Sequence, residues 1–323
     1  GYYGYTPSTT LPDFVGTEND IVGFSYNNQD WLLTGNSENL TDNYVTGTIN
    51  TTVGEIFGMN KFVYLKAKAL LQGAYASGGL MNDNLRSGSG GNLIPLTDPY
   101  RSAPYSTAFT HVNNPVPEAA DVPAFANQSN ANDNIVDWVF VEVRNAVTSG
   151  SNILQTRSAL IQRDSDIVDT DGKSPLYFKD LTDHIYTVTI RHRNHLAMST
   201  NNAGNQYARL SNLSYLAEFD FTTATANRLL GNGGNANTSN YNITGGLNML
   251  FGGNANGVLN SNRISFSGSA NDASYILGPV LNGASNVLGN PHGVYHWADL
   301  NMDRQVNFTG TNNDASFILV KSL

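Results

Sequence analysis

Residues 135–144, with the sequence IVDWVFVEVR, form the densest apolar run of the chain and decide its fold class. The run is too short to cross a membrane as a helix, which takes about 20 apolar residues. Its content of Val, Ile, Phe and Trp is typical of a β-strand. The stretch therefore predicts a buried strand, and no membrane insertion is expected.

Segments on both sides of this run repeat the strand pattern. Residues 62–75, FVYLKAKALLQGAY, alternate apolar and polar positions, and residues 184–193, HIYTVTIRHR, do the same. A third apolar segment follows at residues 215–221. Strands at this spacing with turn residues between them, and almost no helical periodicity, predict an Ig-like antiparallel β-sandwich over residues 62–222.

The flanking regions differ in composition. Residues 1–61 mix aromatic and β-branched residues with turn formers and predict an N-terminal β-rich segment, a candidate for subunit pairing. Residues 76–134 are rich in Gly, Asn and Pro, which predicts a long functional or packing loop. Residues 223–251 include GNGGNANTSNYNITGG and predict an Asn/Gly-rich linker.

Bulk composition excludes several classes of protein. The chain has 323 residues, 13% of them charged, a net charge of -9 and no cysteine. Its 17 Lys and Arg never form a run, so no surface suited to a phosphate backbone and no nucleic acid partner is expected. Disulfides and thiolate metal sites are excluded. The first residue is Gly rather than Met, which favours a secreted mature protein.

The C-terminal part contains an internal duplication. Residues 271–277, NDASYIL, align with residues 313–319, NDASFIL, and a Phe-x-Gly triplet precedes each copy at residues 266–268 and 308–310. We therefore expect residues 252–323 to form one module of two related loop–helix units.

The second copy carries a calcium-like pattern of oxygen ligands. Acidic or amide side chains recur at alternate positions, as in a calcium loop, but Gly310 stands at the twelfth position, where an acid is expected. The predicted ligands are Asp299, Asn301, Asp303, Gln305, Asn307 and Asp314. A metal-free Asp/Asn turn is the alternative, in which Asn313 or Asp314 caps the final helix.

The first copy has neutral residues where the second has acids. Its candidate positions are Asn254, Asn256, Asn260 and Asn262. Without carboxylates a divalent cation would be held weakly. We expect this copy to keep its shape through hydrogen bonds among the Asn side chains.

Other polar motifs favour structural interpretations. The acidic stretch at residues 163–172 ends in Asp-Gly, a strong hairpin turn signal. The cluster RHRNH at residues 191–195 is either a set of structural histidines or a basic site for an acidic group or sugar. His292 and His296 have zinc-like spacing, but Pro291 and the missing Glu argue against a metalloprotease helix. No set of acid, base and nucleophile emerges, so an enzyme is not expected.

Aromatic residues in predicted loops are further candidates for ligand or subunit contacts. They lie beside Gly, Pro, Ser and Asn, as expected of exposed positions. These residues are Tyr2, Tyr3, Tyr5, Trp31, Tyr100 and Tyr105. Their rings could stack on sugars or pack against a neighbouring subunit.

Several motifs in order carry a family resemblance. They are LKAKALLQGAY, GGLMNDNLR, LIPLTDPY, IVDWVFVEVRNA, TRSALIQRDSDIVDTDGKSPLYF and IRHRNHLAM. Together with the two terminal loops, residues 62–323 resemble secreted haemagglutinin-like or adhesin-like proteins of Bacteroidota that end on a dockerin-like repeat pair. The resemblance implies an extracellular or cell-surface protein without catalysis in the shared motifs. The family's loop ligands map onto Asp299, Asn301 and Asp303, and onto Asp314.

Three functions are compatible with these sequence features. Low charge, richness in Asn, Thr and Gly, and the aromatic N-terminal segment favour a structural subunit of an extracellular filament or layer, hence a homo-oligomer or homopolymer. Loop aromatics and the resemblance favour a monomeric adhesin or carbohydrate-binding protein with a glycan ligand. A secreted hydrolase is the third. The first is the prediction.

Overall fold

The computed structural model describes residues 62–145, 152–201, 207–211, 217–225, 228–229, 241–256, 263–269, 271–282 and 295–322, and six short strands within residues 2–60. Its secondary structure is mainly β with few helices, as the sequence predicts. Among these residues, no helix has the length and apolar character needed to cross a membrane.

One nine-stranded sheet organises the molecule. Its strand order is β13-β7-β12-β11-β10-β14-β15, with β16 beside β14 and β17 beside β7. The strands are β7 (Phe62–Lys68), β10 (Ile135–Asn145), β11 (Ile153–Gln162), β12 (Asp166–Val168), β13 (Leu176–Lys179), β14 (His184–His192), β15 (His195–Ser199), β16 (Ala208–Leu210) and β17 (Glu218–Asp220). Neighbours are antiparallel except β17, which pairs in parallel with β7.

The sheet curls back on itself. β16 pairs with β14, and Ser211, the next residue, bridges to Tyr64 of β7, whose N–H donates to the Ser211 carbonyl at 2.7 Å. Strands distant in the order are thereby joined, which leaves fewer open edges. All nine strands belong to one hydrogen-bonded network, so this pairing does not confirm the two separate sheets of a sandwich.

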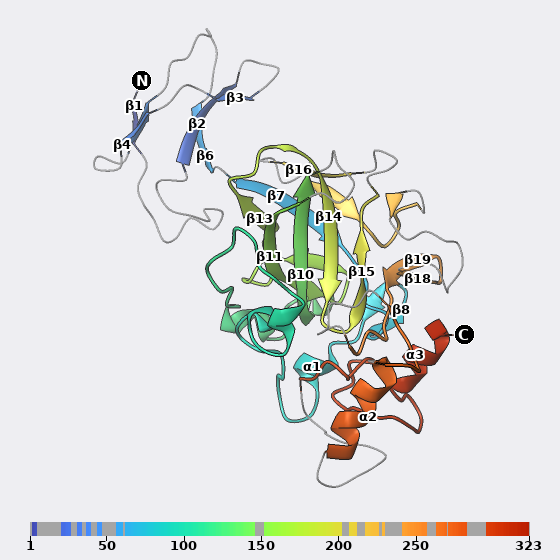
Figure 1. Cartoon of the computed structure of the whole chain (residues 1–323). Coiled ribbons are helices and arrows are strands. Elements are labelled where there is room, and N and C mark those ends of the chain that lie inside the picture. Colours follow the sequence, from blue (N-terminus) through green and yellow to red (C-terminus); the bar gives the residue numbers. More distant parts are fainter. Residues whose placement is uncertain are drawn as a thin grey trace.

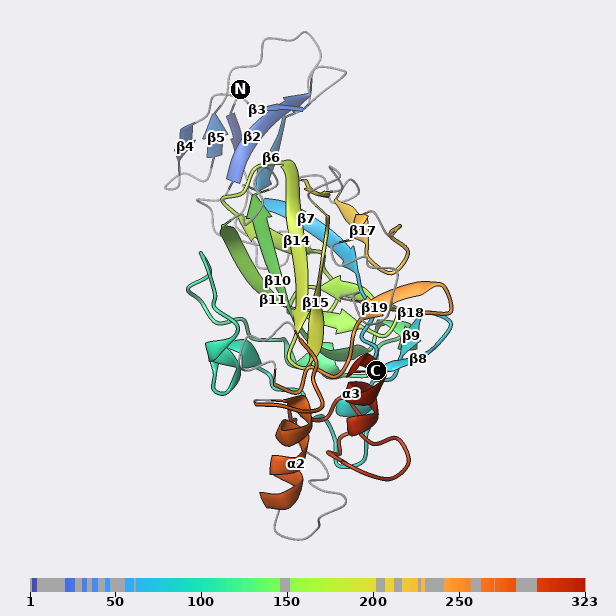
Figure 2. The same ribbon diagram turned by 45° about the vertical axis from the view of Figure 1, so that its right-hand side comes forward.

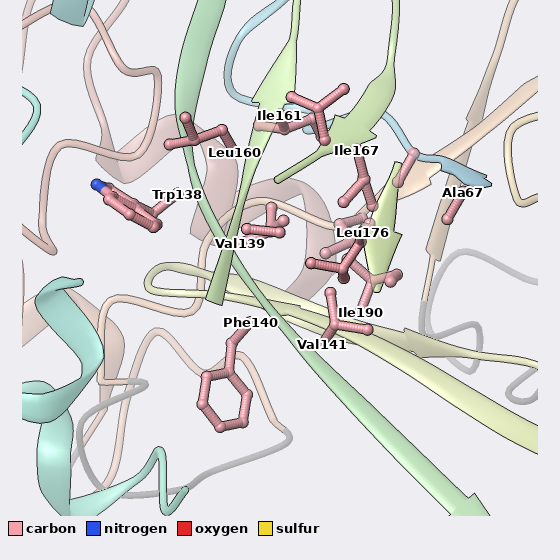
Figure 3. Close-up of a cluster of buried hydrophobic side chains, with 14 of the residues drawn as sticks. Ala67, Trp138, Val139, Phe140, Val141, Leu160, Ile161, Ile167, Leu176 and Ile190 are labelled. Atoms are coloured by element: carbon pink, nitrogen blue, oxygen red, sulfur yellow. The ribbon is translucent and has the colours of Figure 1, made fainter. Parts of the chain in front are cut away.

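The core surrounds β10, which is buried on both faces. Val139 and Val141 pack with Leu176 and Ile190, whereas Trp138 and Phe140, the intervening positions, point away from that cluster (Figure 3). Successive strand side chains alternate between faces, so two buried faces require an almost continuously apolar strand. This explains why residues 135–144 are almost continuously apolar.

The long loop of residues 76–134 covers the outer face of β10. β8 (Tyr75–Ser77) leads into it, and it contains β9 (Leu80–Met81), α1 (Asn84–Ser87) and four short 3-10 helices at Pro99–Arg101, Tyr105–Thr107, Val122–Phe125 and Ala131–Asp133. The Tyr100 hydroxyl donates to the Trp138 carbonyl at 2.9 Å, and its ring lies 5.5 Å from that of Phe140. Tyr100 and Tyr105 are buried, so the prediction of exposed loop aromatics is wrong for both. Covering β10 requires an apolar layer, which these rings supply.

The predicted linker at residues 223–251 contains part of the core. β18 (Tyr241–Thr244) and β19 (Leu247–Leu250) form a hairpin, and Met249 and Leu250 are fully buried. The Leu250 N–H donates to the Leu70 carbonyl at 2.8 Å. Residues 247–251 are therefore packed structure rather than linker.

The C-terminal module, residues 252–323, has its own small core. Its helices are α2 (Asp272–Asn282) and α3 (Ala315–Ser322), at the end of the sheet opposite β1–β6 (Figures 1 and 2). The buried cluster contains Ala255, Ala273, Ile276, Ala298, Leu300, Val306, Ala315 and Ile318. Both copies contribute equivalent positions, so the duplication extends to the packing.

The N-terminal segment is β-rich, as predicted. Its strands are β1 (Tyr2–Gly4), β2 (Ile21–Tyr26), β3 (Trp31–Leu33), β4 (Ser37–Asn39), β5 (Tyr44–Thr46) and β6 (Ile56–Asn60). They form two three-stranded sheets, β1-β5-β4 and β3-β2-β6, neither of which pairs with the nine-stranded sheet in the described part of the chain.

Candidate functional site

The second Asp/Asn loop places its first ligands around one turn. Asp299 accepts the N–H groups of Asp303 and Arg304, each at 3.0 Å, and is fully buried. Asn301 Oδ1 accepts the same Asp303 N–H at 3.0 Å. Asp303 Oδ1 in turn accepts the Gln305 N–H at 2.9 Å. The alternating positions of the sequence pattern therefore converge on one loop.

Asp314 closes the loop from the start of α3. Its carboxylate accepts the N–H groups of Leu300 and Asn307, each at 2.6 Å. Asn313, not Asp314, caps α3, because Asn313 Oδ1 accepts the Ser316 N–H at 2.9 Å. Asp314, which follows Gly310 at the twelfth position where an acid is expected, thus belongs to the loop.

Burial disfavours the charged form of two carboxyl groups in this loop, those of Asp299 and Asp314. Burial raises the pKa of Asp299 to about 7, and Asp303 adds to the shift. Burial and the nearby Asp299 raise the pKa of Asp314 well above its usual value. Among the described residues neither acid forms an ion pair with Lys or Arg. Buried carboxyl oxygens without a cationic partner at ion-pair distance are hard donors of the kind that calcium binds.

The loop carboxylates are not drawn tightly together. Within the described ranges, the only acidic or histidine group with three ligand atoms within 4.8 Å of one another is Asp98, His111 and Glu118. Asp299, Asp303 and Asp314 do not meet this criterion. A cation at this loop would bring them closer.

The first copy keeps the same backbone pattern with one acid. Asp272 accepts the N–H groups of Asn256 at 2.9 Å and Ser265 at 2.7 Å, as Asp314 does in the second copy. Asn271 caps α2 by accepting the Ser274 N–H at 2.9 Å. A buried carboxylate holding backbone N–H groups therefore replaces the expected hydrogen bonds among Asn side chains; Asn260 and Asn262 lie outside the described residues.

A buried polar network joins the module to the sheet. Asp137 of β10 accepts Arg193 Nε at 3.0 Å, His192 Nε2 at 3.0 Å and the Tyr295 hydroxyl at 2.7 Å. Arg193 also donates to the His296 carbonyl. Burial raises the pKa of Asp137, but Arg193 and His192 outweigh it and the net pKa is lowered. The basic cluster of residues 191–195 therefore holds an acid of its own chain.

Hydrogen bonds assign the tautomers of the two buried histidines. His195 Nε2 accepts the Gly73 N–H at 3.0 Å, so His195 carries its proton on Nδ1, 2.9 Å from His192 Nδ1. His192 then donates from Nε2 to Asp137. Burial lowers the pKa of His192 and lowers that of His195 further. Both imidazoles are neutral structural groups, as the structural interpretation predicts.

Asn194 contacts both copies of the duplicated module. Its side-chain amide donates to the Asp299 carbonyl at 2.6 Å, and its own carbonyl accepts the Asn254 N–H at 3.1 Å. The turn between β14 and β15 is therefore the docking point of the module. An Asp within the apolar run at residues 135–144 was the sequence signal for this network, because a buried charge requires a partner.

The remaining motifs have structural roles. Gly172 has φ of 78° in the predicted Asp-Gly turn, and Asp169 pairs with Arg157 at 2.9 Å. His296 stacks on Trp297 with ring centroids 3.8 Å apart, whereas His292 lies outside the described residues.

The group of Asp98, His111 and Glu118 was missed by sequence reasoning. Asp98 Oδ2 lies 2.9 Å from His111 Nε2 and 3.2 Å from Arg101 Nε. Arg101 and Arg157 reach the Glu118 carboxylate at 3.3 and 2.9 Å. The two guanidinium groups already neutralise the oxygens that a metal would need, so the group joins the covering loop to β11 by ion pairs.

Comparison with known proteins yields no relative. The chain matches no protein-family model, no curated protein and no solved structure.

Proposed function

We propose that this chain is a non-enzymatic extracellular structural protein, a subunit of a cell-surface filament or layer. The observation that supports this best is the separation of β1–β6, which pair with one another and not with the large sheet in the described part of the chain. A segment with its own sheets beside a large packed body is suited to pairing with another copy.

The edge strands of β1–β6 favour pairing with another copy. Each three-stranded sheet has two edge strands whose outward N–H and C=O groups require partners. A sheet of three strands needs a packed hydrophobic face to be stable on its own. A strand from a neighbouring copy would satisfy the edge groups and bury apolar side chains at once.

The rest of the chain supplies a rigid body in this proposal. The curled sheet is our candidate for the Ig-like sandwich, and the duplicated module is a dockerin-like cap fixed by Arg193 and Asn194. Calcium is the proposed cofactor of the second loop, and its charge would compensate the buried Asp299 and Asp314. The proposed ligands are the six predicted from the sequence: Asp299, Asn301, Asp303, Gln305, Asn307 and Asp314.

A monomeric adhesin with a glycan ligand is the alternative. It has less support, because Tyr100 and Tyr105 are buried and unable to stack on a sugar. The side chains of Tyr2, Tyr3 and Trp31 lie outside the described residues, as does Tyr5.

Negative-stain microscopy and sedimentation of the full chain test the proposal. We expect concentration-dependent polymers, and monomers when residues 1–61 are deleted. Arg209→Ala, which removes an exposed ion pair with Asp183, is the matched control and should still polymerise. A full chain that stays monomeric at all concentrations and binds a glycan array would replace the proposal with the adhesin.

A further inference from the structure

Arg304 occupies an unusual backbone position in the second loop. It is the sixth residue counted from Asp299, where calcium loops of this pattern require Gly for a sharp turn. Its φ is 79°, in the left-handed region that disfavours residues with a Cβ. A side chain retained at a strained position indicates that the side chain itself is used.

The guanidinium group of Arg304 is buried against α1 and the residues that follow it. Its Nη1 donates to the Asn84 carbonyl at 3.2 Å and the Gly91 carbonyl at 2.9 Å. Gly88 lies so close that a Cβ there would meet Arg304 Cδ at 2.4 Å. The side chain is 7% exposed. Arg304 therefore joins the C-terminal module to the α1 loop, residues 84–91.

The same residue is tied to the candidate cation loop through its backbone. The Arg304 N–H donates to Asp299 Oδ2 at 3.0 Å, and the preceding N–H, of Asp303, donates to Asp299 Oδ1 at 3.0 Å. The Asp299 carboxylate thus sets the turn from which the guanidinium projects. A displacement of this carboxylate would therefore shift the backbone that carries the Arg304 side chain.

We propose that Arg304 couples cation binding at the second loop to docking of the C-terminal module on the α1 loop. The inference rests on the proposed calcium site. Without a cation to draw Asp299, Asp303 and Asp314 together, the turn opens more readily, and Arg304 is withdrawn from the Asn84 and Gly91 carbonyls. Because both events require the same closed turn, docking also strengthens cation binding, by reciprocity.

Hydrogen exchange of the full chain, with calcium and with chelator, provides the test. The amides of Arg86, Gly88 and Gly91 form backbone hydrogen bonds in the α1 loop and report docking directly. We expect chelation to speed their exchange about tenfold or more, while the amides of β10 stay unchanged and confirm that the sheet is folded.

Two variants separate docking from binding. Arg304→Ala keeps the backbone strain and removes the guanidinium, so α1-loop exchange should be fast with or without calcium. Calorimetric calcium affinity should fall about fivefold or more, the usual lower range of coupling between sites. Arg209→Ala, at an exposed ion pair, should behave as wild type.

The results distinguish the proposed calcium site from the proposed coupling role of Arg304. Wild-type protein that binds calcium but exchanges equally with and without chelator overturns the role of Arg304 and leaves the calcium site intact. Arg304→Ala with unchanged α1-loop exchange does the same. Absence of calcium binding to wild-type protein by calorimetry overturns both.

Discussion

The Asp137→Asn substitution tests the buried network that docks the C-terminal module. Asp137 is fully buried and accepts from Arg193, His192, Tyr295 and the Trp138 N–H, the last at 2.8 Å. An Asn retains one acceptor, which suffices for Tyr295 and Trp138. Its amide N–H groups would face the donors of Arg193 and His192, leaving a guanidinium charge buried without a partner.

The magnitude follows from that unpaired charge. Removing one partner of a buried ion pair costs about 3–5 kcal/mol. For a chain of this size that corresponds to a fall in melting temperature of roughly 10 °C. Asp166→Asn is the matched control, because the Lys68–Asp166 pair is about half exposed and such pairs contribute about 0–1 kcal/mol.

Urea unfolding and calorimetry measure both variants, and a double-mutant cycle adds Arg193→Met. If the pair is coupled as the structure indicates, Arg193→Met recovers about 0.5–3 kcal/mol of the loss caused by Asp137→Asn, the usual range for residues in contact. A destabilisation by Asp137→Asn no larger than that of Asp166→Asn, or additive effects in the cycle, would refute the reasoning.

Three further predictions concern the module and its docking. A carboxyl whose folded pKa is raised stabilises the fold once it is protonated, so in chelator the stability of wild type relative to Asp299→Asn should grow as pH falls from about 7 towards the ordinary carboxyl value of about 4; a stability difference that does not change over this pH range would contradict the raised pKa. His195, with a lowered pKa, favours the folded state above pH ~6.5 and opposes it below, so its imidazole resonances should show no titration near pH 6.5; a midpoint there would contradict its neutral role. Gly73→Ala should cost about 1–3 kcal/mol by overpacking, because a Cβ would lie 1.9 Å from the Leu300 carbonyl oxygen; a melting temperature equal to wild type would show that this contact is not made.

Local periodicity predicted the strands well but not what covers them. The alternation in residues 62–75 and 184–193 and the apolar run at 135–144 correspond to β7, β14 and β10. Tyr100 appeared exposed from its Pro- and Ser-rich neighbours. It is buried because β10 is apolar on both faces and needs a second covering layer, a requirement that short windows of sequence do not contain.

The candidate site was likewise predictable only in part. The Asp/Asn spacing identified the loop of Asp299, Asn301 and Asp303 and left Asp314 either in the loop or as the cap of the final helix. The tertiary structure places Asp314 in the loop by folding the start of α3 back onto it. In the first copy, Asp272 has the equivalent role, which the neutral Asn pattern concealed.

The mainly β class and the duplicated C-terminal loops could be predicted from the sequence, because side-chain alternation and turn chemistry depend on near neighbours in the chain. Which charged groups meet depends instead on how distant segments fold together. Asp137 lies 55 positions from His192 and 158 from Tyr295, and Arg304 lies 220 positions from Asn84. Such partners are selected by the need to pair every charge and polar group removed from water, which depends on the packing of the whole chain.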